Sequence, residues 1–91
     1  MGREVKLFKS EERKSRDEVS EFLRLIADKM SAGKVTLSQG QNEITLDIPQ
    51  NLILDVQVED EDKGSRGTQH SLELEIKWFD SDSGGGPLEL K

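Results

Sequence analysis

Apolar and charged residues alternate without a break near the end of the chain, between positions 72 and 78. A period of two places successive side chains on opposite faces of an extended strand. The pattern predicts a β-strand over residues 70–79, with one face in a core and the other in water. The apolar face would carry Leu72, Leu74, Ile76 and Trp78. The polar face would carry a solubilising charge ladder of Glu73, Glu75 and Lys77.

A helical period of three to four residues occurs once, and it predicts a helix over Arg16–Ser31. Ser15 and Glu18 have the spacing of a capping box, in which the side chain of each residue binds the backbone N–H of the other. Gly33 follows the helical pattern, and we expect it to end the helix in a left-handed conformation. The apolar face of this helix is formed by Val19, Phe22, Leu23, Ile26 and Met30.

Four further stretches alternate between apolar and polar residues and predict strands at residues 4–8, 35–38, 44–48 and 52–59. The connections among the last four strands are short, so we expect these strands to form an antiparallel meander. The resulting element order is β-α-β-β-β-β. We therefore predict an α+β fold with two layers: a mostly antiparallel five-stranded sheet, with one amphipathic helix on one face.

The chain of 91 residues has room for one core, and we expect a single α+β domain over residues 1–79. Residues 80–91 are rich in glycine and serine, and we expect them to form a disordered tail. The longest apolar runs are a few residues long, so we expect no membrane span. The absence of cysteine and of an apolar leader segment predicts a cytoplasmic protein.

Charge is unevenly distributed along the chain, whose formal net charge is −6. Residues 1–34 contain nine Lys or Arg and seven Asp or Glu, a net charge of +2. Residues 35–91 contain four Lys or Arg and twelve Asp or Glu, a net charge of −8. Since an acidic protein repels nucleic-acid phosphate and anionic membranes, this balance disfavours nucleic acid as a partner except near the start of the chain.

The predicted sheet is wider than the helix that would cover it. Five strands at about 4.8 Å spacing make a sheet roughly 24 Å wide, whereas a helix is about 10 Å across. Either the sheet coils around the helix, with Trp78 filling the corner between them, or apolar surface remains for a partner. The second alternative predicts a homodimer or an unidentified protein partner. Its candidate interaction surface is the aromatic margin formed by Trp78, Phe79 and Phe8.

An ordered set of segments carries a family resemblance: Leu7-Phe8-Lys9-Ser10, the helical stretch from Phe22 to Asp28, Val35-Thr36-Leu37, Ile48-Pro49, and Leu72 to Trp78. In this combination the chain resembles the amphi-Trp domain family over roughly residues 4–79. The resemblance implies a small cytosolic α+β protein. It supplies no catalytic, cofactor-binding or partner-binding residues.

Residues suited to catalysis or metal binding are few. His70 is the only histidine and precedes Ser71, but neighbours in a strand point to opposite faces and cannot act together as base and nucleophile. The acidic stretch around Asp60 and Asp62 lacks the spacing of a calcium loop, because Gly64 stands where a third ligand belongs. We therefore expect no enzyme activity, no metal site and no cofactor.

Basic residues gather around the predicted start of the helix, where backbone N–H groups favour anions. This basic cluster consists of Lys9, Arg13, Lys14 and Arg16. Acidic residues, among them Glu12 and Glu18, are interleaved with it. Our first functional hypothesis is a non-catalytic protein-interaction or self-association module. The alternative is a weak nucleic-acid or phosphate binder that uses the basic cluster.

Overall fold

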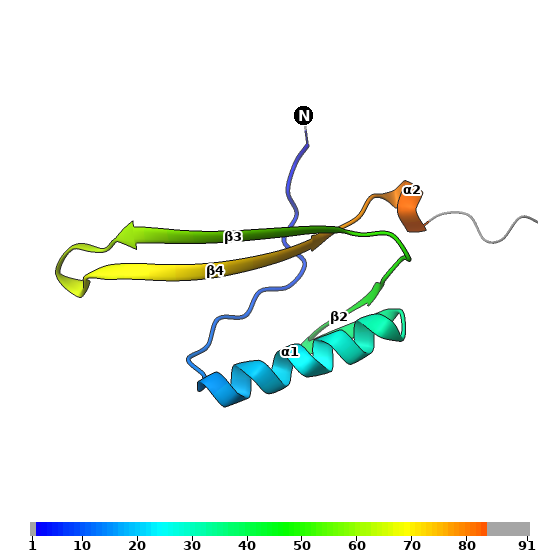
Figure 1. The fold of residues 1–91 in the computed structure, drawn as a ribbon. Helices are drawn as coiled ribbons and strands as arrows, with labels where there is room; N and C mark the ends of the chain where they lie inside the picture. The colour runs from blue at the N-terminus through cyan, green and yellow to red at the C-terminus, as the bar shows by residue number, and fades with distance from the viewer. Residues whose placement is uncertain (1, 84–91) are drawn as a thin grey trace, which may run out of the picture. The chain divides into compact units, whose positions relative to one another are not determined.

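A computed structural model describes residues 2–83, which contain one main helix and four antiparallel strands (Figure 1). The chain divides into two units, the N-terminal unit (Met1–Ile48) and the C-terminal unit (Pro49–Lys91). The α+β class is therefore confirmed. The N-terminal unit contains α1 (Arg16–Ser31), β1 (Lys34–Gln39) and β2 (Asn42–Asp47). The C-terminal unit contains β3 (Ile53–Asp62), the 3-10 turn η1 (Gly64–Arg66), β4 (Thr68–Lys77) and the short helix α2 (Asp80–Ser83).

Helix α1 begins at the predicted capping box. Ser15 Oγ accepts a hydrogen bond from the N–H of Glu18 at 3.1 Å, and Glu18 Oε1 accepts one from the N–H of Ser15 at 3.0 Å. These bonds occupy backbone donors that the start of a helix leaves unpaired. At the other end, Gly33 has φ 88° and its N–H donates to the carbonyl of Met30 at 2.9 Å. The predicted helix and both of its caps are confirmed.

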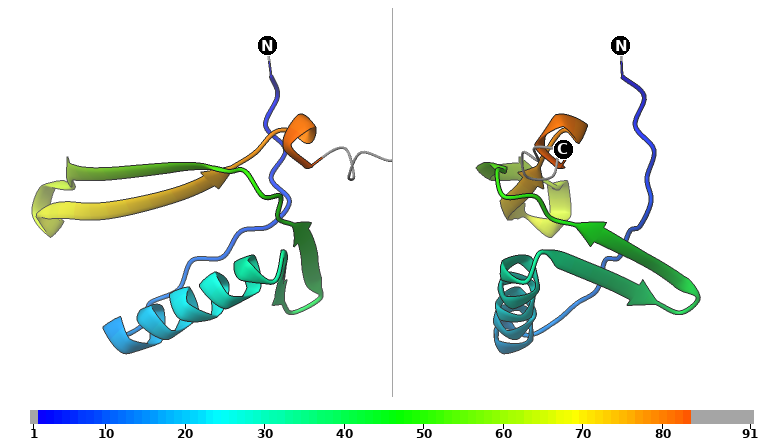
Figure 2. Two further views of the ribbon diagram at one scale, coloured as in Figure 1. Left: turned by 45° about the vertical axis from the view of Figure 1, so that its right-hand side comes forward. Right: turned by 90° about the vertical axis from the view of Figure 1, so that its right-hand side faces the viewer.

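Strands β1 and β2 form a hairpin, and β1 contacts α1 (Figure 2). The two strands are joined by Gly40 and Gln41, and Gly40 has φ 60°, which glycine adopts without steric cost. Val35 pairs with Leu46 and is only 5% exposed. It is the one buried apolar residue in the described part of the chain, so the small core of the N-terminal unit is centred on β1.

Strands β3 and β4 form a second, longer hairpin, paired in register over ten residues of each strand. The side chain of Asp62 accepts a hydrogen bond from the N–H of Gly64 at 2.8 Å, and the N–H of Lys63 donates to the carbonyl of Gly67 at 2.8 Å. This part of the acidic stretch therefore shapes the turn between the strands. No described residue of the C-terminal unit is buried.

The predicted five-stranded sheet is wrong. Among residues 2–83, β1 pairs only with β2 and β3 pairs only with β4, so the structure has two two-stranded sheets. Pro49 has no backbone N–H to donate to a ladder, and the N–H of Ile48 already donates to the carbonyl of Gly33 at 2.9 Å. The alternating pattern of a strand is the same whichever strand lies beside it. The pattern therefore could not decide whether β2 pairs with β3.

The predicted strand at residues 4–8 is also wrong, because these residues have no regular secondary structure. Val5 and Leu7 remain exposed. A short alternating stretch becomes a strand only where a neighbouring strand supplies partners for its backbone, and this stretch has no such ladder in the described structure.

The last strand ends earlier than its alternating pattern does. Strand β4 ends at Lys77, so Trp78 and Phe79 follow the strand instead of lying within it. Of the segment predicted to be a disordered tail, residues 80–83 form α2, and residues 84–91 lie outside the described part of the chain. None of the helices in residues 2–83 is long and apolar enough to cross a membrane.

Candidate interaction surfaces

One side of the β3–β4 hairpin is apolar along three consecutive cross-strand pairs. Alternation places the even-numbered residues of both strands on this side. The pairs are Leu54–Ile76, Val56–Leu74 and Val58–Leu72, and we call these six residues the apolar face. They are between 37% and 76% exposed. Large contiguous patches of exposed apolar surface are typical of sites that bind another molecule.

The other side of the same hairpin is charged. Asp55 lies across from Glu75, and Gln57 lies across from Glu73. Lys77 Nζ lies 3.4 Å from Asp55 Oδ2 and 3.5 Å from Glu75 Oε1, so one cation bridges two facing carboxylates and offsets their repulsion. The predicted charge ladder is confirmed. The hairpin therefore has one side suited to water and one side suited to an apolar cover.

The N-terminal unit has a groove of about 610 Å³, lined by the segment before α1, by α1 and by β1. Three of the apolar residues that line it, Val19, Phe22 and Leu25, are exposed. The lining suits an apolar side chain or a short apolar segment better than a charged ligand. The apolar residues of the groove are Phe8, Val19, Phe22, Leu25 and Leu37.

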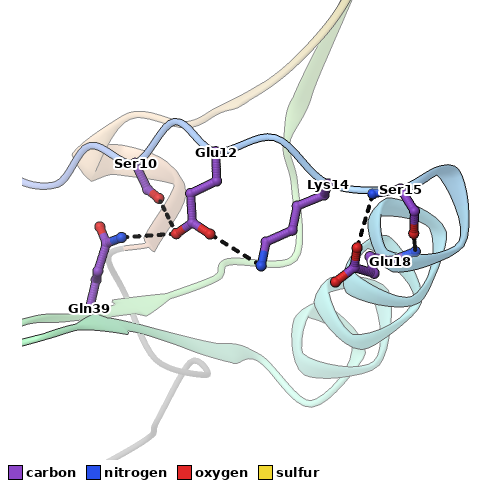
Figure 3. Close-up of polar contacts among 6 residues, drawn as sticks. All are labelled: Ser10, Glu12, Lys14, Ser15, Glu18 and Gln39. Carbon is purple, nitrogen blue, oxygen red and sulfur yellow. Dashed lines mark hydrogen bonds and ion pairs between the residues drawn. The ribbon is translucent and has the colours of Figure 1, made fainter.

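The carboxylate of Glu12 is the centre of the polar contacts at this groove (Figure 3). Gln39 Nε2 donates to Glu12 Oε1 at 2.9 Å, Lys14 Nζ lies 3.2 Å from Glu12 Oε2, and Ser10 Oγ donates to Glu12 Oε1 at 3.5 Å. Gln39 is the last residue of β1, so the contacts tie the segment before α1 to the end of that strand. The sequence pattern did not indicate this tie, because the two residues are 27 positions apart and neither belongs to a motif.

The basic cluster is partly neutralised by its own acidic neighbours. The hydrogen bond and charge of Glu12, followed by the charge of Glu18, raise the pKa of Lys14 above its ordinary value. Hydrogen bonds from the backbone and the side chain of Ser15, followed by the charge of Lys14, lower the pKa of the Glu18 carboxyl. The start of α1 therefore already holds a carboxylate where a phosphate would bind. The other members of the cluster, Lys9, Arg13 and Arg16, are exposed.

The three aromatic residues predicted as an interaction surface differ in exposure. Phe8 is half-buried in the groove of the N-terminal unit. In the C-terminal unit Trp78 is half-buried, whereas Phe79 is 67% exposed. The N–H of Phe79 donates to Asp82 Oδ2 at 2.8 Å, which caps the short helix α2. The role of these aromatic residues in binding stays a prediction.

His70 and Ser71 have separate partners. His70 Nδ1 lies 2.6 Å from Asp60 Oδ1, and both side chains are exposed. Ser71 Oγ donates to the backbone carbonyl of Glu59 at 3.4 Å, and alternation places Ser71 on the opposite side of β4 from His70. Within residues 2–83, no three His, Asp or Glu side chains gather closely enough to hold a metal ion.

Comparison with known proteins gives one finding. No curated protein and no solved structure matches the chain. A family model described as the Amphi-Trp domain matches residues 1–91, which is the whole chain. The resemblance seen in separate segments of the sequence is therefore confirmed, and the chain belongs to the Amphi-Trp domain family.

Proposed function

We propose that this Amphi-Trp domain is a non-catalytic protein-interaction module of the cytoplasm, which associates with itself or with another protein through exposed apolar surface. The observation that supports this proposal is that few apolar side chains are buried. Among the described residues only Val35 is buried, whereas all six residues of the apolar face are open to water. Removing apolar surface from water favours association, and this gain has to exceed the translational and rotational freedom that the two partners lose.

The polar groups of the described residues favour binding over catalysis. An active site requires several polar groups that converge on one reacting position. His70 is paired with Asp60 on an exposed surface, and the hydroxyl of Ser71 lies on the other side of the strand. The absence of cysteine from the sequence supports the cytoplasm as the location.

Dye binding and mass, measured together across a salt series, test this function. We expect the full chain to bind an apolar dye such as ANS, to increase in mass with concentration in light scattering, or to do both. Apolar association does not weaken as salt rises, whereas phosphate binding weakens steeply because it depends on counterion release. A chain that keeps the mass of one copy at every concentration and binds no dye would contradict the proposal.

A further inference from the structure

The segment before α1 has no regular secondary structure, yet one of its side chains is partly withdrawn from water. Among residues 2–14 every residue is exposed except Phe8, which is half-buried. Phe8 lines the groove of the N-terminal unit together with three apolar residues of α1 and with Leu37 of β1. Because removing an aromatic side chain from water is favourable, Phe8 is one point at which this irregular segment is attached to the unit.

A second attachment lies four residues further along the segment. Gln39 Nε2 donates to Glu12 Oε1 at 2.9 Å, and Gln39 is the last residue of β1 (Figure 3). Four residues of extended chain span at most about 14 Å, so the two attachments keep residues 8–12 close to the groove. We call residues 8–12 the strap.

The polar attachment can be broken without leaving a charge unpaired. Lys14 Nζ lies 3.2 Å from Glu12 Oε2, and Ser10 Oγ donates to Glu12 Oε1 at 3.5 Å. Ser10 and Lys14 belong to the same segment as Glu12, so a strap that moves away from β1 keeps both contacts. Release therefore breaks the hydrogen bond from Gln39, which joins two exposed residues. A bond of this kind shifts an equilibrium by only a few-fold.

The apolar attachment is also partial. The groove has a volume of about 610 Å³, and Val19, Phe22 and Leu25 remain about half exposed on it although Phe8 lines it as well. The gains from Phe8 and from Gln39 oppose the conformational entropy that the segment loses when it is ordered. Segments with few buried apolar contacts open locally at a low free energy, so the strap has the properties of an element that opens and closes.

We propose that the strap is a reversible cover built into the N-terminal unit, in which Phe8 occupies the groove and the Glu12–Gln39 hydrogen bond favours the closed position. On release, Phe8 leaves the groove, and the apolar side chains that line the groove with it lose this cover. The strap thereby sets how much apolar surface the groove presents. The inference goes beyond the proposed function, because it concerns contacts inside one unit and holds whichever surface binds a partner.

Methyl NMR spectra of the full chain test whether Phe8 occupies the groove. An aromatic ring shifts the signals of methyl groups beside it, and Phe8→Leu removes the ring but keeps an apolar side chain. We expect Phe8→Leu to move the methyl signals of Leu37, Val19 and Leu25, and Leu7→Val, a change at an exposed neighbour, to leave them in place. Equal movement in the two variants would overturn the proposal. If Phe8→Leu fails to fold, as checked by circular dichroism, nuclear Overhauser contacts between the Phe8 ring and these methyl groups in the wild type decide, and their absence would overturn it.

The same spectra test whether Gln39 holds the strap closed. Gln39→Ala removes the donor to Glu12, and Gln41→Ala removes the same amide from the exposed turn between β1 and β2. We expect Gln39→Ala to raise the ratio of released to closed strap about twofold. The signals of Val19 and Leu25, which lie on α1 and away from the change, should then move towards their positions in Phe8→Leu. Gln41→Ala should leave them in place, and equal effects of the two variants would overturn the proposal.

A second pair of variants tests the same hydrogen bond from the side of the strap. Glu12→Ala removes the acceptor, whereas Glu11→Ala removes the same charge from the adjacent residue, which does not line the groove. Both variants change the net charge from −6 to −5, so any difference between them comes from the position of the carboxylate. We expect Glu12→Ala to move the α1 methyl signals in the direction that Gln39→Ala does. Signals that move equally in Glu11→Ala, or that do not move in Glu12→Ala, would overturn the role of this bond in closing the strap.

Discussion

The two hairpins of this chain have the same alternating pattern and differ in burial. The β1–β2 hairpin has six-residue strands and contacts α1, and its Val35 is 5% exposed. The β3–β4 hairpin has ten-residue strands and three apolar cross-strand pairs, yet none of its residues is buried. Alternation produces an apolar face, but only a second layer removes that face from water. Among the described residues of its own unit, the longer and more apolar hairpin therefore has no second layer that buries its apolar face.

The largest expected effect comes from replacing one valine in each hairpin, which tests the difference in burial between them. Val35→Ala removes buried methyl groups and should lower the free energy of unfolding by about 2 kcal/mol. Val58→Ala removes the same groups from a residue that is 76% exposed. This variant should change the free energy of unfolding by less than about 0.5 kcal/mol. Urea unfolding of both variants at the same low protein concentration, followed by circular dichroism, measures both changes. Equal losses of unfolding free energy in the two variants would mean that Val35 and Val58 are buried to the same extent in solution.

A smaller effect is expected at the start of α1, the main helix of the N-terminal unit. Ser15→Ala removes the acceptor for the N–H of Glu18 and should lower the free energy of unfolding by about 1 kcal/mol. Ser10→Ala is the matched control, because the Ser10 hydroxyl donates a long hydrogen bond of 3.5 Å to Glu12 and caps no helix. Urea unfolding monitored by helical circular dichroism compares them. If both variants lose the same stability, the cap does not contribute to the N-terminal unit.

Acidification should weaken the same cap by less than Ser15→Ala does. The pKa of Glu18 is lowered in the folded chain, so its charge contributes stability above the ordinary carboxyl value of 4.5, and this contribution is lost as pH falls below that value through the folded pKa. Glu18→Gln keeps a side chain that can accept the capping bond and removes the charge. The difference in helix stability between wild type and Glu18→Gln should therefore shrink as the pH is lowered from 6 to below 4. A difference that does not depend on pH would rule out this role of the charge.

The smallest expected effect concerns the contact between Glu12 and Gln39. Glu12→Ala and Gln39→Ala should each cost no more than about 0.5 kcal/mol, because both residues are exposed. The double variant should lose less than the two single losses combined, since both remove one hydrogen bond. A thermodynamic cycle from urea unfolding measures the coupling. Full additivity would show that the contact does not stabilise the N-terminal unit in solution.

Local features of the sequence predicted local structure well. Ser15, Glu18 and Gly33 placed α1 at its observed bounds, because capping involves residues only a few positions apart. The alternation around Leu74 correctly divided β4 into an apolar and a charged side. The tie between Glu12 and Gln39 could not be predicted, because no local pattern connects residues so far apart in the chain.

Capping and alternation depend on residues close together in the chain, so the helix and the two-sided strands could be predicted from the sequence alone. The family resemblance could also be seen in the sequence. Strand pairing and burial depend on contacts between distant segments, and these required the three-dimensional structure. An alternating strand has the same pattern beside any neighbour and under any cover. For that reason the sequence predicted one five-stranded sheet, whereas residues 2–83 form two hairpins, and the one buried side chain among these residues belongs to the hairpin that contacts α1.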